Sequence, residues 1–172
     1  ANSSQQAVTV TINNLDDAAP TITSGAVAVA INENSGAGQV IYTATSTDLD
    51  DDVADTPIAY SLSEDSDAAL SIDLVTGEVS LATDPDHEAK SQYRFAVIAN
   101  DAAGNVSDAQ SVTLDINDLD EVAPTVTSGD TAVAIDENSG ADQVIYTATA
   151  DDTADISDGF TFSLAEGSDA AL

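Results

Sequence analysis

The sequence predicts an all-β protein: a seven-stranded Greek-key immunoglobulin-like sandwich, repeated in tandem along the chain. Three observations lead to this fold class. Apolar and polar residues alternate with a period of two, turn residues separate the alternating segments, and long stretches recur at a fixed offset of 104 residues. No stretch of ten residues carries the 3.6-residue stripe of an amphipathic helix.

Seven segments of the central repeat alternate as strands do. We predict strands at residues 21–31, 39–47, 57–62, 69–73, 78–82, 92–99 and 110–116. Turn pairs such as Thr76-Gly77 and Gly104-Asn105 separate them. Seven short antiparallel strands in a repeat of this length are typical of an immunoglobulin-like sandwich. The predicted core face contains Val40, Tyr42, Ile58, Tyr60, Leu70, Ile72, Val79, Leu81, Phe95 and Val97.

The repeat also predicts the domain organisation. Residues 30–44 recur at 134–148 with 13 of 15 positions identical. We therefore expect the last strand and linker of a preceding repeat (1–18), a complete repeat (19–122) and the first half of the next repeat (123–172). Partial copies on both sides indicate an excerpt of a longer array.

The charge balance excludes whole classes of partner. The chain has 32 Asp plus Glu residues against two Lys plus Arg, which gives a formal charge of −30. Binding to nucleic acid or to an anionic membrane surface needs clustered cations, so neither is a predicted partner. No apolar run approaches the roughly 18 residues of a membrane span, and no direct membrane insertion is predicted. The absence of cysteine excludes disulfides and thiolate metal sites.

Acidic residues gather in the predicted loops, at residues 48–52, 84–88, 118–121 and 151–155. Each close pair of carboxylates costs roughly 1 kcal/mol even in water. Calcium takes about six to eight oxygen ligands and needs neither His nor Cys. The composition therefore favours Ca²⁺ as the cofactor.

Six short motifs, in their order along the chain, resemble those of the cadherin-like repeats, specifically the bacterial tandem repeats of large surface adhesins. Each motif is weak alone, and the ordered set is specific. The motifs are Glu33-Asn34 (with Glu137-Asn138), Asp48-Leu49-Asp50, the strand-turn-strand over 70–79, Asp86-His87-Glu88, Asp101 to Gly104, and the linker Asp118 to Pro124.

The resemblance implies metal ligands at two junctions between repeats. One junction would use Glu33, Asp86, Glu88, Asp118, Asp120 and Glu121, joined by Asp152 or Asp155. The other would use Asp16, Asp17, Asp48, Asp50, Asp55 and Asp101. Two departures affect the number of ions: Asn14 stands where the other junction has Asp118, and the last copy is two residues shorter near its first acidic loop.

Taken together, these features predict a calcium-rigidified extracellular extender or stalk of a cell-surface adhesin, which supports adhesion by mechanical reach. The predicted partners are neighbouring repeats of the same chain, and the resemblance implies the surface of a Gram-negative bacterium. The alternative is a calcium-dependent recognition module that binds a polysaccharide or mediates homophilic contact with another adhesin molecule. High identity between copies favours the stalk, because a specific binding surface usually needs only one optimised copy.

An enzyme is not predicted. The single histidine, His87, lies in an acidic loop and gives no credible triad. Asp84 and Asp86 could mimic a glycosidase carboxylate pair, but seven aromatic residues at strand positions do not suggest a sugar-binding cleft. A helix-loop-helix calcium loop starting at Asp48 is excluded because Val53 stands at its glycine position.

Three further interpretations stay open. Asp51 and Asp52 are either part of a calcium-binding loop or only solvated loop charge. A threonine face over residues 43–47 is either ordinary strand chemistry or a surface for ice or crystalline sugar. Strand pairing between molecules through residues 1–18 is the third.

Overall fold

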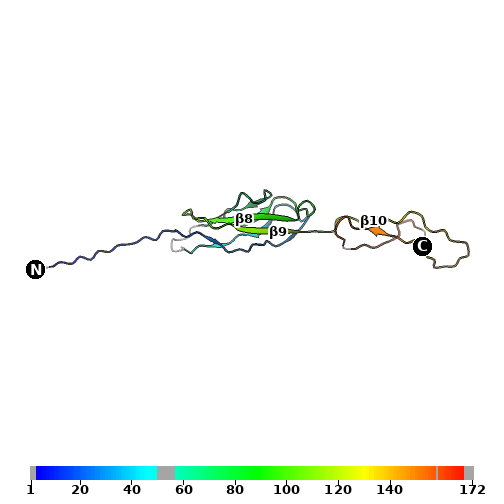
Figure 1. Ribbon diagram of the computed structural model, residues 1–172, viewed down its shortest axis with the longest axis horizontal. Coiled ribbons are helices and arrows are strands. Elements are labelled where there is room, and N and C mark those ends of the chain that lie inside the picture. Colours follow the sequence, from blue (N-terminus) through cyan, green and yellow to red (C-terminus); the bar gives the residue numbers. More distant parts are fainter. Residues whose placement is uncertain (1–2, 50–56, 158, 169–172) are drawn as a thin grey trace. The chain divides into compact units, whose positions relative to one another are not determined.

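The computed structural model describes residues 3–49, 57–157 and 159–168 (Figure 1). The chain divides into two compact units, Ala1–Asn117 and Asp118–Leu172. All regular secondary structure in the described residues is strand. The boundary between the units falls directly after the last strand of the first unit, at the start of the predicted linker.

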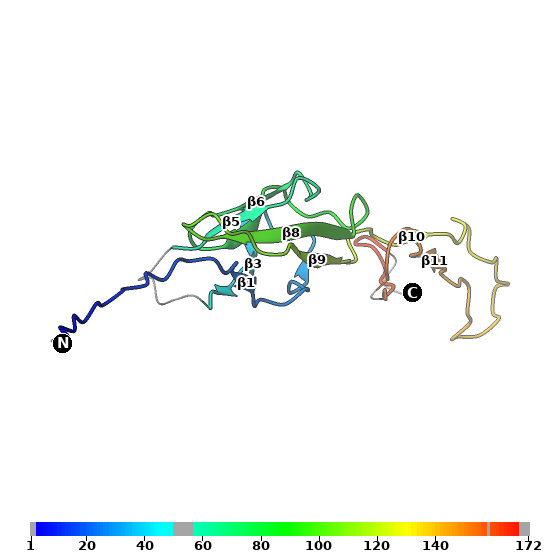
Figure 2. The ribbon, with the colours of Figure 1, turned by 60° about the vertical axis from the view of Figure 1, so that its left-hand side comes forward.

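The first unit contains two principal sheets. A four-stranded sheet has the order β2-β9-β8-β5, a three-stranded sheet the order β3-β7-β6, and a short β1-β4 pair accompanies them. The strands β8 and β9 lie side by side as the longest antiparallel pair (Figures 1 and 2). The bounds are β1 (Thr21–Ile22), β2 (Ile31–Asn32), β3 (Gln39–Thr43), β4 (Ser46–Thr47), β5 (Ala59–Leu62), β6 (Leu70–Ile72), β7 (Glu78–Leu81), β8 (Gln92–Asn100) and β9 (Gln110–Asn117).

The first predicted strand, 21–31, is wrong as a single element. Its start forms β1, which pairs antiparallel with β4, and its end forms β2, which pairs parallel with β9. The chain changes from one sheet layer to the other between them, after the Ser24-Gly25 turn. Alternation alone cannot reveal such a change, because both halves keep the same period.

The second predicted strand, 39–47, is also divided, into β3 and β4. Between them the Ala44 N–H donates a hydrogen bond of 2.8 Å to the carbonyl of Gly77. Gly77 has a φ of +71°, and a Cβ on it would stand 2.7 Å from the Ala44 carbonyl oxygen. The break therefore depends on a close approach of two backbones that only glycine permits.

The core lies between the two sheets. Of the predicted core face, Val79, Leu81, Phe95 and Val97 are buried. Five further members are half-buried: Tyr42, Tyr60, Leu70 and Ile72, which pack against the core, and Ile58, which precedes β5. The buried set also includes Ala28, Ile41, Ala44, Tyr93, Ala99, Val112, Leu114 and Ile116.

Val40 was predicted to face the core, and this is wrong. Its side chain is 53% exposed, whereas that of Ile41 is 6% exposed. The register between β3 and β7 shifts between Val40 and Tyr42. Such a bulge adds one residue to a strand and exchanges the faces on which the neighbouring side chains lie.

In the second unit, β10 (Thr125–Val126) pairs antiparallel with β11 (Ala150–Asp151), as β1 pairs with β4. The hydroxyl oxygens of Thr23 and Thr45 lie 2.9 Å apart, and so do those of Thr127 and Thr149, 104 residues later. The two copies of the repeat therefore share this pairing. Residues 3–18 form no strand, and their assignment to a preceding repeat stays a prediction.

Candidate metal-binding poles

The described acidic residues that are predicted ligands in the first unit lie at two ends of the sandwich. Because β8 and β9 are antiparallel, their C-terminal ends lie at opposite ends of the sandwich. Asp101 follows β8 directly, whereas Glu33 follows β2 and its N–H donates to the carbonyl of Asn117, the last residue of β9 (3.1 Å). We call the Asp101 end, with Asp16, Asp17, Asp48 and Asn105, the upper pole. The lower pole is the Glu33 end, with residues 84–88.

At the upper pole, three acids from distant segments converge. One carboxylate oxygen each of Asp16, Asp48 and Asp101 lies within 4.8 Å of the others. Two oxygens bound to one calcium ion at 2.3–2.6 Å are at most about 5 Å apart. The separation and the all-oxygen donor set therefore fit a calcium ion.

Asp101 is held by a tight loop at the end of β8. Its Oδ1 accepts hydrogen bonds from the backbone N–H groups of Gly104 (2.7 Å) and Asn105 (2.8 Å), and its Oδ2 accepts one from the Asn105 side chain (2.8 Å). Asp101 as a whole residue is 7% exposed. Burial raises the pKa of Asp101, but the hydrogen bonds from Asn105, Gly104 and Ala103 outweigh it and leave the pKa below its ordinary value.

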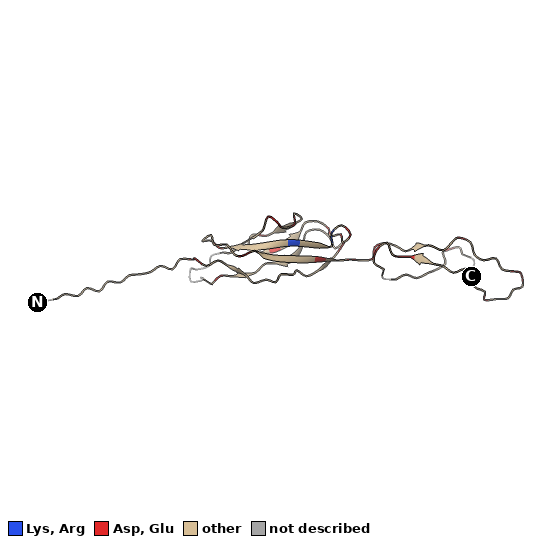
Figure 3. Cartoon of the chain, in the orientation of Figure 1, with Lys and Arg blue, Asp and Glu red and all other residues tan. Residues whose placement is uncertain are grey.

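The two cations of the chain are engaged elsewhere. Lys90 Nζ lies 2.5 Å from Asp67 Oδ1 and 4.7 Å from the centre of the Tyr93 ring. Arg94 Nε donates to Gln92 Oε1 (2.8 Å) on the long strand β8, where Figure 3 shows the blue of a cation. Neither of these contacts neutralises the three carboxylates of the upper pole.

The lower pole is organised by backbone hydrogen bonds. Glu33 is 1% exposed, and its Oε2 accepts a hydrogen bond from the N–H of His87 (2.8 Å). Asp84 Oδ1 accepts from the N–H of Gly36 (2.7 Å), and Asp86 Oδ1 accepts from the N–H of Ala89 (2.8 Å). The bonds from His87 and Gly36 join the loop after β2 to the loop before β8.

The remaining predicted ligands are distributed as follows. Asp17 and Asp86 are exposed, and Glu88 is exposed with its Oε1 3.6 Å from His87 Nδ1. Asp50 and Asp55 lie outside the described residues. The other five belong to the second unit: Asp118, Asp120, Glu121, Asp152 and Asp155.

Within the second unit, the linker contacts the loop that follows β11. Asp155 Oδ2 accepts a hydrogen bond of 3.1 Å from the N–H of Glu121. Asp152 Oδ2 accepts one from the hydroxyl of Ser157. Asp155 and Glu121, both predicted ligands, therefore lie beside each other in this unit.

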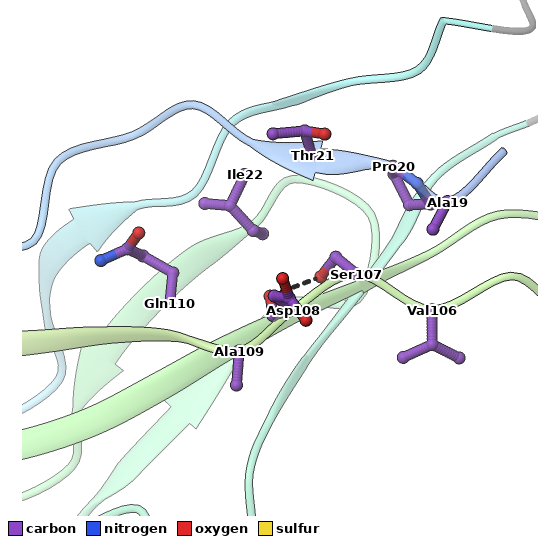
Figure 4. A pocket seen from close by; sticks show the side chains of 9 residues that line it. All are labelled: Ala19, Pro20, Thr21, Ile22, Val106, Ser107, Asp108, Ala109 and Gln110. Atoms are coloured by element: carbon purple, nitrogen blue, oxygen red, sulfur yellow. Dashed lines mark hydrogen bonds between the residues drawn. The ribbon is translucent and has the colours of Figure 1, made fainter.

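A shallow recess beside β1 has a different character. It encloses about 330 Å³ between residues 19–22 and residues 106–110 (Figure 4). Its lining mixes small apolar residues with Thr21, Ser107, Asp108 and Gln110. The Ser107 hydroxyl donates to the backbone carbonyl of Asp108 (2.9 Å). The one carboxylate in this lining, that of Asp108, has no acid or histidine beside it in the lining set, so the recess offers no acid/base pair.

Sequence reasoning missed Asn105 and the structural use of Asp84. Asn105 directly follows the motif Asp101 to Gly104, of which only the acid was interpreted. Asp84 was considered only as half of a glycosidase pair. Both positions lie within four residues of a predicted ligand in the chain, which is the signal that was available.

Sequence comparison places most of the first unit in one family. The sequence model of the Cadherin domain matches residues 27–117. Protocadherin gamma-A6 of Homo sapiens is 30% identical over 137 residues, which cover 77% of this chain and 14% of that protein. Cadherin-5 of Danio rerio is 33% identical over 120 residues, or 69% of this chain and 15% of that protein. The chain thus spans only a small part of the length of these relatives.

Solved structures agree on the fold. The EC1-2 structure of human Protocadherin-24 has a TM-score of 0.58 at 18% identity, over 79% of this chain and 60% of that one. The EC22-24 structure of mouse Cadherin-23 has a TM-score of 0.54 at 24% identity, over 66% of this chain and 37% of that one. These likenesses confirm the predicted immunoglobulin-like sandwich. Among the described residues, no helix is long and apolar enough to cross a membrane.

Proposed function

Since the chain belongs to the cadherin domain family, we propose that it is a calcium-rigidified extender of an extracellular cell-surface adhesin. The observation that carries the proposal is the upper pole, where Asp16, Asp48 and Asp101 bring carboxylate oxygens within 4.8 Å of one another. Asp16 precedes the sandwich in the chain, whereas the other two belong to its loops. An ion at this position would link residues 3–18, which we call the incoming chain, to the sandwich.

Calcium would supply the positive charge that the upper pole needs. Three carboxylates at this separation repel one another, and the two cations of the chain have the partners described above. Asp16, Asp48 and Asp101 would hold the ion, with Asp17, Asp50 and Asp55 as further proposed ligands. Bending at the pole would then require several coordination contacts to break together.

The lower pole is proposed as one half of the second junction. Glu33, Asp86 and Glu88 would provide its ligands from the first unit, and Asp118, Asp120 and Glu121 would provide those of the linker. Asp152 or Asp155 would complete the site. Three features support this: Glu33 is buried at the end of β9, the linker begins directly after β9, and Asp155 already contacts Glu121.

The bacterial setting is also part of the proposal. The relatives compared above are eukaryotic, and their likeness concerns the domain family. Support for a bacterial adhesin comes from the chain itself: neighbouring repeats are nearly identical over residues 30–44 and 134–148, and cysteine is absent. Both features suit a long array of interchangeable spacers on the surface of a Gram-negative cell.

Backbone ¹⁵N relaxation of the 172-residue chain tests the extender function. With calcium, we expect amides of the two units to report one shared tumbling time, because the junction is locked. With EDTA, we expect two separate tumbling times. Separate tumbling in both conditions would contradict the rigid-extender function, even if calcium binds.

The second candidate is a homophilic recognition module. One fold relative, Protocadherin gammaB7, is described as a cis-dimer in its EC3-6 structure. Sedimentation and aggregation of beads coated with the chain separate the two candidates. Calcium-dependent bead aggregation would favour recognition, whereas dispersed beads with a calcium-stiffened chain would favour the extender. A glycan array covers the polysaccharide alternative.

A further inference from the structure

We propose that Asn105 is a positioning residue for calcium at the upper pole, which fastens the incoming chain at Asp16 to the loop that carries Asp101. This inference rests on the proposed calcium function and assigns a role to a residue that is not itself a predicted ligand. Its side chain would bring two ligands together before the ion arrives.

The side-chain amide of Asn105 spans two segments that are 89 residues apart in the sequence. Its Nδ2 donates to Asp101 Oδ2 at 2.8 Å and to the backbone carbonyl of Asp16 at 3.3 Å, with Asp16 Oδ1 at 3.5 Å. All three neighbours are acceptors, so the amino group and not the carbonyl of the amide must face them. The same bonds therefore fix both the orientation of Asn105 and the separation of the two acids.

The backbone of Asn105 reinforces this arrangement. Its N–H donates to Asp101 Oδ1 (2.8 Å), and its carbonyl accepts from the N–H of Asp101 (3.2 Å). The adjoining residues Asn100 and Val106 form an antiparallel bridge. Asn105 is thus held at the base of a closed loop, and its side chain is directed towards the incoming chain.

Asparagine suits this position better than either obvious replacement. Alanine would lose both N–H donors, and the segment around Asp16 would lose its contact with the loop. Aspartate would keep the shape but would place a fourth carboxylate beside the other three. Residues that orient metal ligands through hydrogen bonds commonly change metal affinity by about 10- to 100-fold when they are replaced.

The test uses the full 172-residue chain with Asn105→Ala, with Asn105→Leu, which is close to asparagine in shape and uncharged, and with the control Gln92→Ala. Gln92 Nε2 makes a comparable amide-to-carboxylate bond with Asp115 Oδ1 (2.7 Å), at the opposite end of β8. Calcium is titrated while the amide resonance of Gly104 reports binding at the upper pole. We expect Asn105→Ala and Asn105→Leu to weaken this binding at least about tenfold, and Gln92→Ala to leave it unchanged.

A second measurement follows the contact between Asn105 and Asp16 in the absence of metal. In EDTA, the heteronuclear ¹⁵N NOE of the Asp16 amide should fall in Asn105→Ala and stay at its wild-type value in Gln92→Ala. If both Asn105 variants bind calcium as the wild type does, the positioning role is overturned and the calcium function stands. If the wild type shows no calcium-dependent shift at Gly104, the calcium function falls, and this inference falls with it. If Asn105→Ala does not fold, Asn105→Leu decides the question.

Discussion

The two poles of the first unit use carboxylates in different ways. At the lower pole, Glu33 is almost fully buried and accepts a hydrogen bond from the N–H of His87. At the upper pole, Asp16, Asp48 and Asp101 face one another from three segments. The lower pole thus has an acid that stabilises the fold of its own unit. At the upper pole, Asp101 also accepts backbone hydrogen bonds from Gly104 and Asn105, but the three carboxylates that meet there repel one another until a cation binds.

This difference shows that the number of acids at a pole does not determine its response to calcium. An acid that already accepts backbone hydrogen bonds contributes to stability in the absence of metal. Acids that face one another add a repulsion, which a bound ion relieves. The predictions below separate the two cases by comparing stability in EDTA and in calcium.

The largest effect is expected from a change at Gly77, which is not a predicted metal ligand. Gly77→Ala would place a Cβ 2.7 Å from the Ala44 carbonyl oxygen at a φ of +71°. We expect a loss of about 2 kcal/mol or more in the free energy of unfolding, because backbone strain and a steric clash add together. Urea unfolding should show the same loss in EDTA and in calcium.

Gly25→Ala is the matched control for this change, since a Cβ there meets nothing within 4 Å. It should leave stability nearly unchanged. A loss in Gly77→Ala that disappears in calcium would mean that the Gly77 turn belongs to the metal response, and the comparison between poles would then need revision.

At the lower pole, Glu33→Gln should destabilise the chain even in EDTA. The substitution replaces a buried charged acceptor with an amide, and the hydrogen bond from His87 N–H weakens. We expect a loss of about 1–3 kcal/mol by urea unfolding. The exposed Glu64→Gln is the control. Wild-type stability of Glu33→Gln in EDTA would contradict the structural role of this acid.

At the upper pole, the effect of Asp48→Asn on the melting temperature should change sign when calcium is added. In EDTA it removes a repulsion of roughly 1 kcal/mol per close pair, so the melting temperature should rise. In calcium it removes a ligand, so the melting temperature should fall below that of the wild type. The exposed Asp65→Asn serves as the charge-matched control. A shift in the same direction under both conditions would refute the proposed role of Asp48.

The smallest effect concerns Asp73, in the turn after β6, which is not a predicted metal ligand. Backbone hydrogen bonds from Thr76 and Val75 to the carboxylate lower the pKa of Asp73 below its ordinary value of 3.8. A lowered pKa in the folded state means that ionised Asp73 stabilises the fold above pH 3.8, and that this contribution is lost as pH falls through the folded-state pKa.

The wild type should therefore melt slightly above Asp73→Asn at neutral pH, and the two curves should converge below pH 3.8. Thermal unfolding in EDTA across this range measures the gap, with Asp65→Asn as the control. A gap that stays constant into acid would show that the hydrogen bonds, and not the charge, carry the effect.

Much of the fold followed from local pattern. Residues 78–81 and 92–100 alternate cleanly, and they form β7 and β8 close to the predicted bounds. Local pattern failed where long-range pairing decides the structure. The parallel pairing of Ile31 with Ile116 and the bulge at Ile41 depend on partners far away in the sequence, and no periodicity within either segment encodes them.

The candidate site was predictable from the sequence to about the same extent as the fold. The resemblance to cadherin-like repeats selected Asp16, Asp48 and Asp101, and the structure brings these three together. Asn105 was not selected because its importance lies in a contact with Asp16, 89 residues away. Glu33 was selected as a ligand, but its burial and its bond to the His87 backbone follow from the packing of two loops.

The central claim is that calcium stabilises this chain by binding its acidic poles. It is tested most directly by thermal unfolding of the 172-residue chain in excess EDTA, in about 5 mM CaCl₂, and in NaCl of equal ionic strength. That calcium concentration exceeds the roughly 10⁻⁴–10⁻³ M affinities of extracellular calcium modules. Binding to the folded state alone must raise the melting temperature. We predict a large rise in calcium that NaCl does not reproduce; equal melting temperatures in calcium and NaCl would contradict the claim.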